Sequence, residues 1–416
     1  MMNIGKLPLY IRVLIGMFFG LLAGFVVTKL GASEFAEDWI APWGVIFMRL
    51  LKLIAVPLVF LSLIKGVSNL GDIRSLSTMG LKVVGIYILT TCAAITFGLI
   101  VASVVRPGAV ISQEAATSLR DAAEQSGMNM SASSVDAAPL DAIVNIFPEN
   151  MFGAMANNNS MLQVIAVAIL IGIAAIMVDK RSSEPMLNLV SSIEAIVIKM
   201  VDIVMMYAPF GVFALICMAV VDSAGDLSLL SALGLYFVTV AGTLFVLIVG
   251  FYPLLIRLFS KLSPFEFLKT MFPVQLVGFS TSSSAATLPL TMETATKRLG
   301  ISERTASFVL PVGMTINMDG TSCYQVIASI FIAQIFGVEL SFMTLLGLIT
   351  VITISSIGTP GIPGGSIVVL TMVLASAGIP IEGLALIMAV DRPLDMLRTV
   401  ANVTGDVTVA AIVDRG

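Results

Sequence analysis

The sequence predicts an all-α polytopic membrane protein with eight transmembrane helices and two re-entrant helical hairpins arranged as inverted repeats. Of its 416 residues, 58% are apolar and 12% are charged, about half the charged fraction of a soluble domain. The apolar residues occur in blocks of roughly 20, the length that crosses about 30 Å of hydrocarbon. In the C-terminal half, polar runs of small residues interrupt the apolar sequence.

Six uninterrupted spans are expected in the first part of the chain. They are Leu9–Leu30, Val45–Leu70, Leu81–Val105, Met161–Val178, Ile193–Val221 and Leu229–Phe259. No small-residue cleavage site follows the first apolar stretch, so we interpret it as a helix rather than a signal peptide.

Basic residues lie at alternate ends of these spans, which predicts a cytoplasmic N-terminus by the positive-inside rule. The residues that set this orientation are Lys6, Arg12, Arg74, Lys180, Arg181, Arg257, Lys261 and Lys269. The acidic loop Arg106–Asn150 then lies outside. We expect a multi-pass protein of the cell inner or plasma membrane with both termini in the cytoplasm.

Composition excludes several functions. The chain has no histidine, which removes His-based triads, His metal sites and His proton relays. Its three cysteines stand alone in apolar segments, so neither a disulfide framework nor a CxxC metal site is expected. There is no basic tract that would indicate nucleic acid, and we do not expect an enzyme.

Two stretches after Pro264 have an apolar arm, a polar tip of small residues and a second apolar arm. The tips are Phe279–Pro289 and Ser355–Ser366. Because Gly and Pro at the second tip oppose a continuous helix, and irregular backbone at membrane depth needs protein or a water-filled cavity around it, we predict re-entrant hairpins. The alternative is that these small residues mediate close helix packing. Opposite entry sides indicate an inverted repeat with its site at the midplane.

A polar motif, Asn317–Thr321, interrupts the apolar segment after the first hairpin. An unwound turn there frees backbone carbonyls, and Asp319 adds a carboxylate, a ligand set that suits a small hard cation. The alternative is an Asx turn outside the membrane.

The last predicted helix carries a polar stripe. Its members are Asp391, Asp395, Arg398, Asn402 and Asp406, at spacings of three or four residues. At about 100° per residue they share roughly one quarter of the helix surface. Arg398 can bind a carboxylate, Asp395 an ammonium group and Asp406 a cation. The alternative is a solvated face of a surface helix. Near the outer end of the second span, we interpret Arg49 and Lys52 as side chains that reach the interface; the alternative is that they meet a moving domain.

Several motifs together resemble the dicarboxylate/amino acid:cation symporters, the glutamate transporter family, along nearly the whole chain. They are RLLKLIAVPLVF at Arg49–Phe60, YAPFGVFALI at Tyr207–Ile216, the serines Ser280–Ser284, NMDGT at Asn317–Thr321, the GTPGIPGG tip, and DMLRTVANVTGD at Asp395–Asp406. The resemblance implies a homotrimer that works by an elevator mechanism in contact with membrane lipids. It also implies a scaffold of residues 8–70 and 140–221 and a transport domain of residues 78–105 and 227–414, with hairpins at 264–295 and 341–378.

The resemblance also implies the ligand sets. Substrate contacts are expected from Ser282, Ser283, Ser284, Met318, Thr321, Ile362, Pro363, Gly364, Gly365, Ser366, Asp395, Arg398, Thr399 and Asn402. Three sodium sites are expected from Gly313, Asn317, Asn402 and Asp406; from Thr315, Met318, Ser356, Ile357 and Thr359; and from Tyr87, Thr90, Thr91, Asn317 and Asp319. Na⁺ is then a co-transported ion rather than a prosthetic group.

Three positions refine this expectation through the resemblance, and two more depart from the pattern of the archaeal members. Neutral amino acid exchangers lack an arginine matching Arg398, and dicarboxylate carriers lack the acid matching Asp395, so an acidic α-amino acid is favoured. Gln325 stands where proton- and potassium-coupled mammalian relatives carry Glu. Ser282 replaces a hairpin arginine of the archaeal members, and Arg392 offers an arginine from the last helix instead.

The favoured function is therefore a sodium-coupled symporter that imports aspartate, glutamate or both. Asp319 and Asp406 favour sodium over the alternative, a proton-coupled glutamate/dicarboxylate symporter. A passive channel and a serine hydrolase that uses Ser282–Ser284 are further alternatives, the latter disfavoured because no base is evident.

Overall fold

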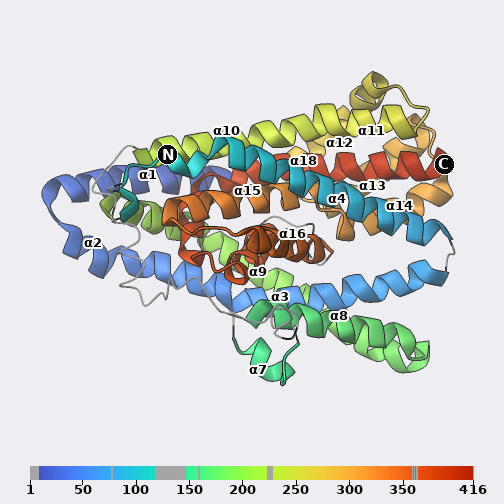
Figure 1. The fold of residues 1–416 in the computed structure, drawn as a ribbon, viewed down its shortest axis with the longest axis horizontal. Helices are drawn as coiled ribbons and strands as arrows, with labels where there is room; N and C mark the ends of the chain where they lie inside the picture. Colours follow the sequence, from blue (N-terminus) through green and yellow to red (C-terminus); the bar gives the residue numbers. More distant parts are fainter. Residues whose placement is uncertain are drawn as a thin grey trace, which may run out of the picture.

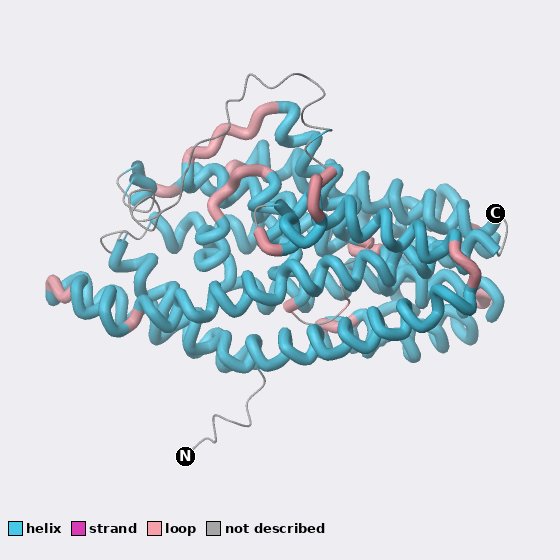
Figure 2. The backbone as a smooth tube through the Cα atoms, turned by 90° about the horizontal axis from the view of Figure 1, so that it is seen from below, coloured by secondary structure: helices cyan, strands magenta, loops and turns pink. Residues whose placement is uncertain are grey.

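The computed structural model describes residues 9–75, 78–113, 115–117, 144, 147–157, 160–222, 228–357, 359, 361 and 364–415. In this part of the chain all regular structure is helical and no strand occurs (Figure 2). Most helices run along the long axis of the molecule (Figure 1).

All six predicted spans form helices. They are α1 (Leu9–Leu30), α3 (Ala41–Ser75), α4 (Thr78–Val105), α8 (Met161–Met177), α9 (Lys180–Asp222), and α10 (Ser228–Val246) continued by the π-helical η4 (Leu247–Phe251) and by α11 (Tyr252–Phe259). Short elements connect some of them: α2 (Ser33–Trp39), η2 (Pro107–Val110) and α7 (Met151–Met155). Within the described residues, α1, α3, α4, α9, the α10–α11 run and the last helix, α18 (Leu384–Arg415), are long and apolar enough to cross a membrane. The chain is thus a multi-pass membrane protein.

Helix α1 packs against α9 through a stripe of glycines spaced by four. A Cβ on Gly16, Gly20 or Gly24 would collide with the backbone of α9, at Pro209, Phe213 and Cys217 in turn. Only glycine lets two apolar helices approach this closely, which is a common device in membranes.

The C-terminal half contains broken helices where the sequence predicts them. The elements are α12 (Pro264–Thr281), α13 (Ser284–Glu293), η5 (Thr294–Arg298), α14 (Glu303–Ile316), α15 (Asp319–Phe336), α16 (Phe342–Ser356), α17 (Gly365–Ser376) and η6 (Ile381–Gly383). Helix α12 packs on α13, and α16 on α17. The first tip turns because Ser282 adopts a left-handed φ of 51°, which ends α12. Both predicted tips are therefore helix breaks.

The helices form two packing groups. The first group consists of α9 and the helices that pack with it, α1, α3 and α8. The second consists of α18 and helices that contact it: α4, α10, α12, α14 and α15. The tip between α16 and α17 meets the first group, because a Cβ on Gly66 of α3 would collide with the Ile357 carbonyl. Helix α18 lies at the centre, and 89% of the stretch Val390–Asp414 is buried. Its polar stripe is therefore not a solvated face.

The side chain of Lys52 on α3 contacts another element of the fold, one of the two alternatives expected for it: its Nζ lies 3.1 Å from Oε1 of Glu382 in η6. The two side chains are about one third exposed, at 32% and 37%, so the pair joins the two packing groups at a partly open position.

Candidate functional site

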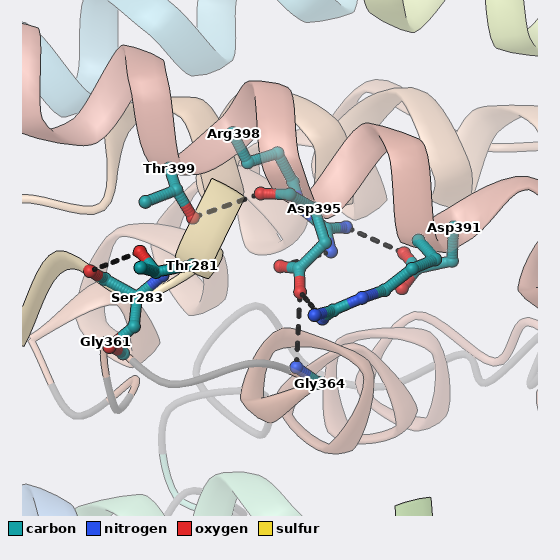
Figure 3. A network of polar contacts seen from close by, with 9 residues as sticks. Thr281, Ser283, Gly361, Gly364, Asp391, Asp395, Arg398 and Thr399 are labelled. Atoms are coloured by element: carbon teal, nitrogen blue, oxygen red, sulfur yellow. Dashed lines mark hydrogen bonds and ion pairs between the residues drawn. The ribbon is translucent and has the colours of Figure 1, made fainter. Parts of the chain in front are cut away.

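The centre of the site is an arginine held between two carboxylates on one face of α18 (Figure 3). The spacing of seven and three residues brings Asp391, Asp395 and Arg398 onto this face. Arg398 is 1% exposed, and its guanidinium donates to Asp391 Oδ1 at 2.8 Å and to Asp395 Oδ1 at 2.9 Å. Its charge also lies 3.8 Å from the ring centroid of Tyr324 on α15, close enough for a cation–π contact. A buried guanidinium needs such compensation, because an unpaired charge away from water is costly.

The second oxygen of Asp395 has different partners. Arg392 Nη1 donates to Asp395 Oδ2 at 3.0 Å, and the backbone N–H of Gly364 donates to the same oxygen at 3.3 Å. Gly364 precedes α17 with a φ of 79°, a left-handed conformation that favours glycine. The second tip is thus held directly to the acid of α18.

The two hairpin tips also contact each other. Ser283, which lies beside Gly361 in Figure 3, donates through its Oγ to the Gly361 carbonyl at 2.9 Å. The same Oγ accepts from Ala286 N at 3.2 Å, which caps α13. A Cβ on Gly361 would lie 3.3 Å from the Met314 carbonyl and 3.4 Å from the Ser284 side chain. Both tips therefore close over the same region beside the break between α14 and α15.

That break is formed by Asn317 and Met318. Asn402 of α18 forms hydrogen bonds with the residues at the break. The Gly320 N–H donates to Asn402 Oδ1 at 2.8 Å. The Asn402 amide nitrogen donates to Thr321 Oγ1 and to Met318 Sδ, each at 3.3 Å. An asparagine on α18 thus orients the first turn of α15.

Two separate groups of oxygen atoms flank the break. In the first, Asn317 Nδ2 donates to Asp406 Oδ1 at 2.9 Å, while the buried Asn317 Oδ1 has no hydrogen-bond partner among the described residues. Gly313 completes this group, because a Cβ there would collide with Tyr87 Oη and lie 2.5 Å from Asp406 Oδ1. A carboxylate beside an unpaired amide oxygen suits a small hard cation.

The second group surrounds Asp319, which is fully buried. Thr91 Oγ1 donates to its Oδ1 at 2.7 Å, Thr90 Oγ1 to the same oxygen at 3.4 Å, and Tyr252 Oη to its Oδ2 at 3.2 Å. Helices α4, α11 and α15 therefore converge on one carboxylate. Hydroxyl and carboxylate oxygens of this kind can ligate Na⁺ or satisfy a buried acid without it.

Other predicted site residues are less well defined by contacts. Ser282 and Ser366 are buried with hydroxyls that have no partner among the described residues, and Ser284 is also buried. Thr315, Ser356, Thr359 and Thr399 bond through their hydroxyls to backbone carbonyls of preceding residues. Gly365 begins α17, and Ile357 ends the first arm of the second hairpin. Ile362 and Pro363 lie outside the described residues.

Sequence reasoning did not assign four residues of this network. Asp391 was placed on the stripe but given no role, although its spacing of seven from Arg398 puts it on the same face. Tyr252, Tyr324 and Gly361 make contacts between segments far apart in the chain. For the tyrosines, the sequence offers one indication: the hydroxyl of a buried tyrosine usually finds a hydrogen-bond partner.

The fold and the site define a class: a polytopic helical membrane protein with a buried polar site between broken helices, the arrangement of a secondary transporter. The chain belongs to the Sodium:dicarboxylate symporter family, whose profile matches residues 9–416. The resemblance seen in the motifs is thus confirmed.

Curated relatives agree in length as well as in sequence. A proton/sodium-glutamate symport protein of Bacillus caldotenax is 32% identical over 99% of this chain and 94% of its own. A proton/glutamate-aspartate symporter of Escherichia coli is 33% identical over 98% and 92%. An excitatory amino acid transporter of Caenorhabditis elegans is 32% identical over 95% and 84%.

Proposed function

We propose that this protein is a sodium-coupled symporter that imports aspartate, glutamate or both. The observation that carries the proposal is the buried guanidinium of Arg398 between two carboxylates, one of which, Asp395, also accepts from Gly364 of the second hairpin tip. The two tips themselves meet through Ser283 and Gly361. The relatives named above for glutamate or aspartate support the same substrate class. A transporter of acidic amino acids needs this mixture of charges, because its cargo carries two carboxylates and one ammonium.

In this proposal the side-chain carboxylate of the substrate takes the place of an aspartate on Arg398. The planar guanidinium can then form two parallel hydrogen bonds with it. Asp395 receives the α-ammonium group, and hydroxyls of the first tip, Ser282 to Ser284, face the α-carboxylate together with backbone N–H groups of the second tip. The buried Ser282 Oγ, which lacks a partner among the described residues, is available for this contact.

Sodium ions would bind at the oxygen groups beside the break. We assign one ion to Gly313, Asn317, Asn402 and Asp406, and another to Tyr87, Thr90, Thr91, Asn317 and Asp319. We assign a third to carbonyls of Thr315, Met318, Ser356, Ile357 and Thr359, which belong to the break and to the nearby second tip. Each carboxylate balances the charge of an ion that crosses with the substrate.

We propose eight transmembrane helices and two re-entrant hairpins, with N- and C-termini in the cytoplasm, in a homotrimeric assembly. The two packing groups support a division into a scaffold (8–70 and 140–221) and a transport domain (78–105 and 227–414). The transport domain, with the hairpins 264–295 and 341–378, would slide as an elevator past the scaffold.

The second candidate function is proton-coupled symport of the same substrates. It is favoured by the relatives named for proton coupling. The enclosed position of Asp319 also favours it, because the hydroxyls of Thr90, Thr91 and Tyr252 can hydrogen-bond to a carboxylate or to a protonated carboxyl group. Sodium remains the main proposal because each of the two carboxylates lies beside further oxygen atoms: Asp319 beside the hydroxyls of Thr90 and Thr91, and Asp406 beside Asn317.

Substrate class is tested by uptake of radiolabelled aspartate into proteoliposomes that contain the purified protein. Unlabelled aspartate and glutamate should compete, whereas alanine should not, because it lacks the carboxylate that Arg398 binds. Competition by alanine as strong as by aspartate would contradict the proposed substrate class.

A further inference from the structure

Arg392 is the one arginine beside Arg398 in the polar cluster of α18 that the proposed substrate contacts leave without a role. Its side chain is 13% exposed, and its Nη1 lies 3.0 Å from Asp395 Oδ2. Residues three apart on a helix are neighbours, so this ion pair forms within α18 without help from another element. Its Nε is buried and has no hydrogen-bond partner among the described residues.

The pair divides Asp395 between two arginines. Arg398 donates to Oδ1, and Arg392 donates to Oδ2, which also accepts from the backbone of Gly364. In the arrangement seen here, both oxygens of this carboxylate are therefore engaged. An ammonium group that binds Asp395 must share or replace one of these donors.

Arg392 is the donor that can leave. Arg398 is 1% exposed and is also paired with Asp391, whereas Arg392 has no second acidic partner among the described residues. Arg392 lies on the side of α18 that faces α9, where it lines a small cavity together with Met205, Gly364 and Asp395. Arg392 therefore has one acidic partner to give up when Oδ2 is taken by another cation, whereas Arg398 would remain paired with Asp391.

The charge of Arg392 affects which substrates the cluster can bind. Asp391 and Asp395 contribute two negative charges, and Arg392 and Arg398 contribute two positive charges, so the cluster is neutral with Arg392 and negative without it. A substrate without an amino group brings no cation to Asp395 Oδ2, which then has only Arg392 as a charged partner. Leaving a buried carboxylate unpaired would be costly.

We infer that Arg392 is a specificity-determining residue that competes with the substrate's α-ammonium group for Asp395 Oδ2. While it holds this oxygen, it weakens the binding of an α-amino dicarboxylate. At the same time it allows some binding of a dicarboxylate that has no amino group. The inference rests on the proposed function, because it assumes that Asp395 receives the ammonium group.

The test compares aspartate with succinate, which has the same two carboxylates and no amino group. Affinities are measured by competition against radiolabelled aspartate uptake for the wild-type protein, Arg392→Met, Arg392→Gln and Arg392→Lys. Methionine and glutamine remove the charge with different polarity, so a folding defect in one variant leaves the other. Lysine keeps a cation and is the matched control.

Both neutral variants should bind aspartate more tightly, whereas inhibition by succinate should not improve. The ratio of aspartate affinity to succinate affinity should rise about 10-fold, because one charged hydrogen bond is worth roughly that factor. Arg392→Lys should keep the wild-type ratio. A defect that is only structural would lower the maximal rate and leave the ratio unchanged.

Equal weakening of both ligands, or an unchanged ratio with unchanged aspartate affinity, would overturn the inference. Either result would mean that Arg392 merely attracts anions or fills space. Failure of the wild-type protein to transport aspartate would instead contradict the proposed function, so the two failures are distinguishable.

Discussion

The amide nitrogen of Asn317 lies 2.9 Å from Oδ1 of Asp406, which joins the break between α14 and α15 to the central helix α18. The amide oxygen of Asn317 is buried without a partner in the described part of the chain. Two segments that are 89 residues apart therefore present carboxylate and amide oxygens at one point, where a cation can be held between them.

Gly313 tests this cation position. An alanine Cβ would collide with Tyr87 Oη and Asp406 Oδ1, so Gly313→Ala should raise the sodium concentration for half-maximal uptake by about 10-fold, the loss of roughly 1.4 kcal/mol. The measurement is aspartate uptake as a function of sodium. Gly242→Ala is the matched control, because nothing lies within 4 Å of its Cβ. Equal sodium dependence in the two variants would contradict the assignment of the site.

Arg398→Ala should abolish binding of acidic substrates. It removes the cation for the substrate carboxylate and leaves Asp391 and Asp395 without their buried partner, an effect of at least about 100-fold in affinity. Binding is measured by titration calorimetry on purified protein, with size-exclusion chromatography to verify assembly. The control is Arg257→Ala at the exposed end of α11, which should bind normally. Unchanged aspartate affinity in Arg398→Ala would exclude the proposed substrate site.

Ser283→Ala should weaken the closure of the two tips. The variant loses the bond to the Gly361 carbonyl and the cap of α13, together worth about 1 kcal/mol. Aspartate affinity should fall about 5-fold, and amide hydrogen exchange at both tips should accelerate. Ser280→Ala is the control, since that exposed serine bonds only to the Leu276 carbonyl of its own helix. Faster exchange at neither tip would show that the contact does not hold them closed.

The Lys52–Glu382 pair should affect movement between the two packing groups. Reversing one charge with Lys52→Glu should change the uptake rate only about 2- to 5-fold, because a partly exposed pair contributes up to about 1 kcal/mol. The double variant Lys52→Glu/Glu382→Lys should restore the wild-type rate. Lys297→Glu, which disrupts an exposed pair with Glu293, should have no effect. A double variant no better than the single one would mean that the pair is not coupled.

Features set by local periodicity were predictable from the sequence. The stripe of α18 follows from spacings of three and four residues, and the helix breaks at Ser282 and Asn317 follow from poor helix formers in apolar segments. The spacing of three residues between Arg392 and Asp395 is also typical of an ion pair within a helix.

Contacts between distant segments could not be predicted in this way. The hydrogen bond of Tyr252 to Asp319, the cation–π contact of Tyr324 with Arg398, and the bond from Ser283 to Gly361 all depend on how separate helices pack. A tyrosine in an apolar helix has the same local pattern whether it faces lipid or a buried acid. Lys52 illustrates the same limit, since its partner is 330 residues away.

The most direct test of the central claim is uptake of radiolabelled aspartate into proteoliposomes under an inward sodium gradient or an inward proton gradient alone. Sodium-coupled symport predicts accumulation with the sodium gradient and none with the proton gradient. Accumulation driven by protons in the absence of sodium would contradict the claim and establish the proton-coupled alternative.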